Sequence, residues 1–171
     1  MAIGLEDSDV FKQFVAALAG AMRQEIPDVS DTRAEFAVDD IPYVLTADSG
    51  SPAVFVCAVI GALPQDEAER AHVFAKLLHA QYCFSDSCGF SFGVDDDDSF
   101  VLLQALVNTE CVDERHFVEL MEKFIQTANV WSKRLGESAS AEASASELRS
   151  TADKSADKRG MGNGGDFAIQ V

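Results

Sequence analysis

The stretch GFSFGVDDDDSFVLLQAL, residues 89–106, carries the strongest indication of the fold. Aromatic and aliphatic residues at both ends of this stretch favour β-strands, and the run of aspartates between them favours a loop. We therefore predict a β-hairpin with strands over residues 90–94 and 100–106. The aspartates do not match the calcium-binding loop of an EF-hand, because the sixth and twelfth positions from Asp95 hold Phe100 and Leu106 rather than glycine and glutamate.

An amphipathic helix is predicted on each side of the hairpin. The earlier helix opens at Pro64 among acidic residues, which are favourable in the first turn, and reaches Tyr82. Its apolar stripe consists of Ala71, Phe74, Ala75, Leu78 and Tyr82. The later helix runs from about Asp113 to Leu135, and Gly136 is well placed to end it. Its apolar residues recur at helical spacing and are Phe117, Leu120, Met121, Phe124, Ala128, Trp131 and Leu135.

The first part of the chain is predicted to form a helix followed by two short strands. Apolar residues recur at helical spacing over residues 9–26, and a proline follows. A polar connection over 28–32 leads to the strands. In these, apolar residues alternate with others from Phe36 to Val38 and from Ile41 to Leu45, which is the period of a strand with two different faces.

A third strand is predicted over residues 53–60, which are apolar at every position and are expected to be buried on both faces. The order helix-β-β-β-helix-β-β-helix predicts an α+β fold in which a five-stranded antiparallel sheet packs against three helices. Residues 1–136 are expected to form one domain. Residues 137–171, rich in Ser, Ala, Glu and Gly, are expected to form a disordered tail.

The charge of the chain limits its partners. There are 29 Asp and Glu residues against 13 Lys and Arg, which gives a formal net charge of -16. A polyanion repels nucleic acid and anionic membranes, so neither is expected as a partner. The longest run without polar residues, 53–63, is well short of the roughly 20 residues that span a bilayer as a helix. Residues 1–10 lack the regions of a signal peptide, so we expect a cytoplasmic protein.

The sequence lacks the common motifs of catalysis and cofactor binding. It has no phosphate-binding loop, dinucleotide fingerprint or nucleophile elbow, so we expect neither an enzyme nor a cofactor. A cysteine enzyme using Cys83 or Cys88 with His79 or His116 is the alternative, but no basic residue adjoins these cysteines to stabilise a thiolate. A zinc site would need a second close pair of ligands, and none follows.

Three segments resemble the class I type III secretion chaperones. They are residues 77–81, the hairpin 89–94 with its acidic loop to 100–102, and residues 124–131. The resemblance covers residues 9–135 and implies a bacterial protein that holds a secreted effector in extended form for export, without ATP. It also implies the secretion ATPase or the sorting apparatus as a further partner. The alternative is a structural or regulatory subunit of the secretion machinery.

The resemblance also implies a homodimer joined mainly through the helix before the hairpin and the neighbouring strand region. That helix carries too many large apolar residues for one narrow stripe against the sheet. The predicted dimer interface consists of Phe74, Leu77, Leu78 and Tyr82. We expect the effector on the first half of the domain, on an apolar face or strand edge that the short chain leaves uncovered. The candidate effector-binding residues are Phe14, Phe36, Val38, Tyr43, Leu45 and Val54.

Truncation after Gly136 is expected to leave the melting temperature nearly unchanged. The tail offers few large apolar side chains that could anchor it, namely Leu148, Phe167, Ile169 and Val171. Scanning calorimetry of the truncated and full-length chains measures the difference. A loss of several degrees would show that the tail packs on the domain.

Overall fold

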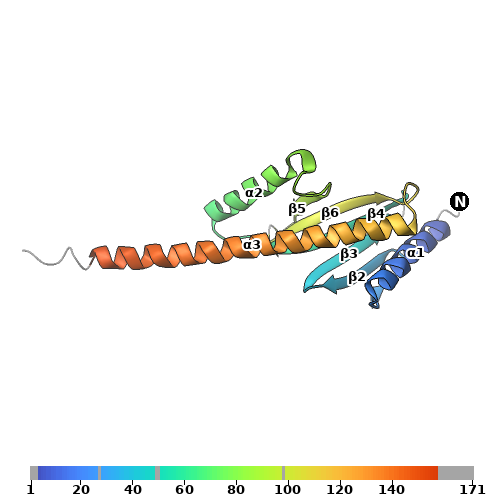
Figure 1. Cartoon of the computed structure of the whole chain (residues 1–171), viewed down its shortest axis with the longest axis horizontal. Helices are drawn as coiled ribbons and strands as arrows, with labels where there is room; N and C mark the ends of the chain where they lie inside the picture. The colour runs from blue at the N-terminus through green and yellow to red at the C-terminus, as the bar shows by residue number, and fades with distance from the viewer. Residues whose placement is uncertain (1–3, 27, 49–50, 98, 158–171) are drawn as a thin grey trace, which may run out of the picture. The chain divides into compact units, whose positions relative to one another are not determined.

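The computed structural model describes residues 4–26, 28–48, 51–97 and 99–157, and side chains within 9–136 of these ranges. The chain divides into two compact units, Met1–Leu135 and Gly136–Val171. The elements of the first unit are shown in Figure 1. In chain order the elements are α1 (Gly4–Met22), β1 (Asp28–Val29), β2 (Arg33–Val38), β3 (Ile41–Ala47), β4 (Ala53–Ala62), α2 (Glu67–Gln81), the short 3-10 helix η1 (Tyr82–Phe84), β5 (Ser91–Val94), β6 (Phe100–Asn108) and α3 (Glu114–Asp157).

The strands form one sheet in the order β1-β2-β3-β4-β6-β5, and every neighbouring pair is antiparallel. The five predicted strands are all present in the predicted order, so the α+β fold with its three helices is confirmed. The sheet has one more strand than predicted. Asp28 and Val29, placed in a polar connection by the sequence, pair with β2 as the two-residue strand β1. So short an edge strand has no alternation that could reveal it.

The core lies on one side of the sheet, which we call the inner face. Helices α1 and α3 cover this face (Figure 1). Phe14 of α1 stacks on Phe117 of α3 with ring centroids 4.6 Å apart. Phe124 of α3 meets the edge of Tyr43 on β3, with centroids 6.2 Å apart. The buried strand residues of the inner face are Ala34, Phe36, Ile41, Tyr43, Leu45, Val54, Val56, Ala58, Ile60, Val101, Leu103 and Val107.

A bulge interrupts the alternation of β4 near its end. Val59 pairs with Leu102, but the next paired residue is Gly61, which lies opposite Val101. Ile60 is buried in the core, and a Cβ on Gly61 would lie 3.1 Å from the side chain of Leu135 in α3. Two consecutive residues of β4 therefore face the helices, and the absence of a side chain at Gly61 allows α3 to approach.

Helix α2 begins with a side-chain cap and ends at a sharp turn. The carboxylate of Asp66 accepts a hydrogen bond from the Glu69 backbone N–H, which satisfies a donor of the first turn. After Gln81 the chain turns through η1, where Cys83 and Phe84 have positive φ angles. The Trp131 indole N–H donates to the carbonyl of Asp86 at 3.0 Å and ties this turn to α3.

The predicted bounds of α1 and α3 differ most from the structure. Helix α1 spans Gly4–Met22 rather than 9–26. Helix α3 passes through Gly136, where the sequence predicted its end, and reaches Asp157, so residues 137–157 are helical rather than disordered. A single glycine costs a helix only about 1 kcal/mol relative to alanine, and the segment after it is rich in alanine and glutamate, which are strong helix formers. Residues 158–171 of the predicted tail lie outside the described residues.

Candidate functional site

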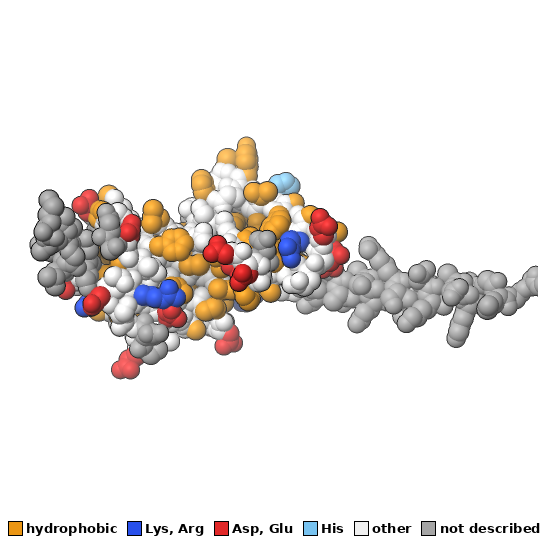
Figure 2. All heavy atoms as spheres, turned by 180° about the vertical axis from the view of Figure 1, so that it is seen from behind, with side chains coloured by type: hydrophobic (Ala, Val, Ile, Leu, Met, Phe, Trp, Pro, Cys, Tyr) orange, Lys and Arg blue, Asp and Glu red, His pale blue; other side chains and the backbone are white. Residues whose placement is uncertain are grey.

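The face of the sheet opposite the inner face, which we call the outer face, is apolar and partly open to solvent. Phe55 of β4 is 38% exposed and its cross-strand partner Leu106 of β6 is 74% exposed. Val44, Cys57, Val59 and Leu102 are half-buried beside them. Figure 2, which views the molecule from behind, shows hydrophobic side chains gathered across this region. An open apolar area of this kind on a monomer marks a surface for binding.

The outer face also lacks charge at its centre, although the chain as a whole is strongly acidic. The outward positions of the three central strands follow from the strand register. They are Pro42, Val44, Thr46, Phe55, Cys57, Val59, Leu102, Gln104 and Leu106. None of these side chains is charged. The outer face is therefore suited to apolar side chains of a partner rather than to an ion or a nucleic acid.

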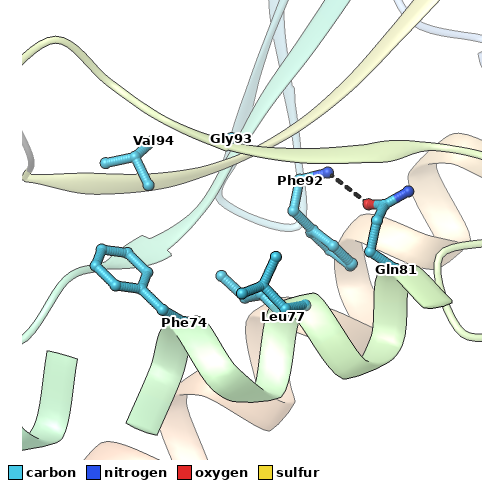
Figure 3. A pocket seen from close by; sticks show the side chains of 7 residues that line it. Phe74, Leu77, Gln81, Phe92, Gly93 and Val94 are labelled. Atoms are coloured by element: carbon cyan, nitrogen blue, oxygen red, sulfur yellow. Dashed lines mark hydrogen bonds between the residues drawn. The ribbon is translucent and has the colours of Figure 1, made fainter. Parts of the chain in front are cut away.

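A second apolar surface lies between α2 and β5, at one end of the sheet. A groove of about 290 Å³ separates the two elements, and its lining is almost wholly apolar (Figure 3). The groove is lined by Phe74, Leu77, Leu78, Gln81, Phe92, Gly93 and Val94. Leu78 and, at the end of the same helix, Tyr82 are 70% and 77% exposed. A hollow and exposed apolar side chains thus occur on one small region of the surface.

The four residues predicted for the dimer interface do not lie in one environment. Leu77 is buried, and its main contacts are therefore within the domain. Phe74 is half-buried at the groove and packs against the core. Only Leu78 and Tyr82 are open to a partner over most of their surface. Helical spacing places these residues on neighbouring faces of α2, but it does not show which face meets β5 and α3.

Five of the six predicted effector-binding residues are buried in this structure. Phe14 of α1 is buried against α3, and the four strand residues are buried on the inner face. These four are Phe36, Tyr43, Leu45 and Val54. Val38 is half-buried against the core. Alternation along a strand shows which residues share a face, but it does not show which of the two faces the helices cover.

Residues of the outer face were missed for a related reason. The run 53–60 was predicted to be buried on both faces because every residue is apolar, but Phe55 is exposed and Val59 is only half-buried. An apolar strand can equally have one face in a core and the other in a binding surface. The strongest signal in the sequence was that large apolar residues occupy both faces of β6, with Leu102 and Leu106 on one and Val101, Leu103 and Val107 on the other.

The cysteines and histidines do not assemble into a reactive centre within the described residues. No group of three or more His, Cys, Asp or Glu side chains there could hold a metal ion. Burial raises the pKa of the Cys57 thiol, against a smaller lowering by a hydrogen bond with Gln104, so this thiol is less easily ionised than usual. His116 pairs with Asp113, whose pKa is lowered mainly because its carboxylate accepts the His116 backbone N–H at the start of α3.

The sequence predicted no run long enough to span a bilayer as a helix. Among the described residues, no helix is long and apolar enough to cross a membrane.

A sequence model of the Tir chaperone protein (CesT) family matches residues 13–132 of the chain. The chain belongs to this family. The match covers α1 from its middle, the whole sheet, α2 and the first part of α3, so both apolar surfaces lie within it. The resemblance drawn from the three sequence segments is therefore confirmed. Among curated protein sequences, none matches this member of the family.

Several solved structures share the fold. A chain of the ExsC–ExsE complex superposes with a TM-score of 0.59 at 16% identity, over 75% of this chain and 95% of that one. A chain of the HopA1–SchA chaperone–effector complex gives 0.56 at 11% identity, over 76% and 95%. A chain of ExoU–SpcU, from the type III secretion system of Pseudomonas aeruginosa, gives 0.55 at 16% identity, over 72% and 95%. At such identities the likeness establishes the fold of this family member and no more.

Phe36→Glu is expected to unfold the domain rather than to remove a binding contact. The substitution puts a carboxylate on the inner face, where the Phe36 ring now stacks on Tyr43, and should cost on the order of 4 kcal/mol of unfolding free energy. Urea denaturation followed by circular dichroism measures the loss. Ala37→Glu, at the exposed neighbouring position, is the control and should change stability by less than about 0.5 kcal/mol. A Phe36→Glu protein of wild-type stability would place this residue on the surface.

Proposed function

We propose that this chain is an effector chaperone of a type III secretion system, which holds a segment of a secreted effector in extended form until export. The observation that carries the proposal is the open, apolar outer face, uncharged at its centre, on a domain of the Tir chaperone family. An unfolded polypeptide exposes apolar side chains that this face can cover. Each buried Leu, Val or Phe side chain contributes about 1.5–3 kcal/mol, which is enough for a few such contacts to hold a segment without ATP.

The net charge of -16 supports the same function. A protein that keeps apolar surface open is at risk of aggregation, and mutual repulsion between highly charged copies opposes it. The same charge disfavours nucleic acid and anionic membrane surfaces as competing partners. The HopA1–SchA complex, whose fold this chain shares, is a complex of a chaperone with its effector. We place the chain in the bacterial cytoplasm and assign it no catalytic activity.

A homodimer built on α2 is the second part of the proposal. Leu78 and Tyr82 project beside the α2–β5 groove, so one surface region carries both exposed apolar side chains and a hollow. A contact between two copies related by a two-fold axis requires such a self-complementary surface, because each copy presents the same residues to the other. Leu77 stays in the core and supports the helix from within, and Phe74 lines the groove.

Phe55→Glu and Leu106→Glu are each expected to weaken effector capture at least about tenfold, since a carboxylate in an apolar contact loses hydration without gaining a partner. The effector is first identified by mass spectrometry of proteins that copurify with the tagged chain from its host, and affinity is then measured by calorimetry. Circular dichroism and melting temperature should stay as in the wild type.

Val130→Glu is the matched control for these variants, because Val130 is an exposed apolar residue on α3, away from the outer face. It should bind the effector as the wild type does. Unchanged affinity in both outer-face variants would refute this docking surface. Copurification of a component of the secretion machinery, with no secreted protein, would favour the alternative of a machinery subunit.

Leu78→Asp is expected to convert the dimer to a monomer, because the two-fold contact would contain the unpaired charge twice. The dissociation constant of the dimer should rise at least about a hundredfold. Light scattering across a concentration series measures the mass. His72→Asp, exposed on an adjacent face of α2, serves as the control and should remain dimeric. A wild-type chain that is already monomeric, or a dimeric Leu78→Asp variant, would contradict the assignment.

A further inference from the structure

The outer edge of β5 lies beside α2, at the end of the sheet. A strand with a neighbour on one side only leaves alternate backbone N–H and C=O groups without a strand partner. The Asp95 N–H donates to the Phe100 carbonyl at 3.2 Å, so the odd-numbered residues of this strand face β6. The backbone groups of Phe90, Phe92 and Val94 therefore point toward the open edge.

Gln81, the last residue of α2, lies against this edge (Figure 3). Its Nε2 donates to the carbonyl of Phe90 at 3.1 Å, and its Oε1 accepts the N–H of Phe92 at 3.1 Å. A single residue of an added parallel strand would make this same pair of bonds with its own backbone N–H and C=O. The side-chain amide has the same donor and acceptor as a peptide group, and here it takes the place of one.

We propose that Gln81 blocks strand addition at β5, so that the sheet ends there and partners meet the α2–β5 groove through side chains alone. The length of β5 supports this, because a strand of four residues offers little further edge. The acidic run that begins at Asp95 directly after the strand also supports it, because charges at an edge disfavour pairing with another chain. The acidic run thus receives a role that calcium binding does not supply.

The opposite end of the sheet has a related but weaker arrangement. Strand β1 has only two residues, and the Gln24 Nε2 lies 3.5 Å from the carbonyl of Ala37 on β2, at the limit of a hydrogen bond. Gln81 differs in engaging a donor and an acceptor together at shorter distances. The inference goes beyond the proposed function, because it concerns how the domain avoids strand pairing rather than how it holds an effector.

Hydrogen exchange measured by NMR on the full chain tests the inference. Gln81→Met keeps an unbranched, helix-forming side chain and removes both bonds. The Phe92 amide should then exchange at least about tenfold faster, while the amides of β4 and β6 keep their rates. Gln81→Glu retains an acceptor for the Phe92 N–H and lacks the donor to Phe90, so its Phe92 exchange should be intermediate. Gln126→Met, at an exposed glutamine of α3, is the control and should match the wild type.

Sedimentation provides a readout that a purely structural role would not move. With its edge open, Gln81→Met should form species larger than those of the wild type, increasingly so at higher concentration, and Gln126→Met should not. Equal Phe92 exchange in Gln81→Met and wild type, or equal mass at every concentration, would overturn the inference. Uniform acceleration of all amides would also overturn it, because it would show loss of stability alone. None of these readouts requires the effector, so they are independent of the proposed function.

Discussion

The buried ring of Phe124 contacts aromatic side chains from both halves of the domain, before and after α2. On α3, Phe124 meets the edge of Tyr43 from the first half and of Phe90, just before β5, from the second, with centroids 6.2 and 5.0 Å away. Phe14 of α1 joins the same layer by stacking on Phe117. Burial of these rings places α1 and α3 on one side of the sheet. Among the described residues, no helix lies over the centre of β3, β4 and β6 on the other side, where Phe55 and Leu106 are exposed.

The acidic charge is placed where it does not interfere with this arrangement. The central outward positions of the sheet are uncharged, whereas ion pairs within the described residues, such as Lys12 with Asp31, lie at exposed sites. Exposed pairs contribute little to stability, because water and salt screen them. The charge therefore acts mainly on how copies of the chain meet each other and their surroundings, and the packing of aromatic and aliphatic side chains determines the fold.

The order of the helices and of five strands could be predicted from the sequence because most of them have a local period or a continuous apolar run. The acidic run between Val94 and Phe100 marks the hairpin clearly. The sequence does not indicate which side of the sheet the helices cover. Phe36 and Phe55 are both aromatic residues in alternating or apolar strands, yet one lies in the core and the other on the surface. Only the packing of α1 and α3, a contact between distant parts of the chain, distinguishes them. The Gln81 bonds were equally beyond prediction, since they depend on where α2 ends relative to β5.

The bulge at the end of β4 shifts the phase of the strand by one residue. Before it, the even-numbered residues from Val54 to Ile60 face the helices, and after it the odd-numbered Gly61 does. The outward series therefore skips from Val59 to Ala62, which is exposed opposite Phe100. Loss of Ile60 would restore a regular strand, and Gly61 and Ala62 would keep their faces because they keep Val101 and Phe100 as partners. The irregularity thus adds one buried side chain, that of Ile60, to the core beside Gly61, which lies against Leu135 at the far end of this ten-residue strand.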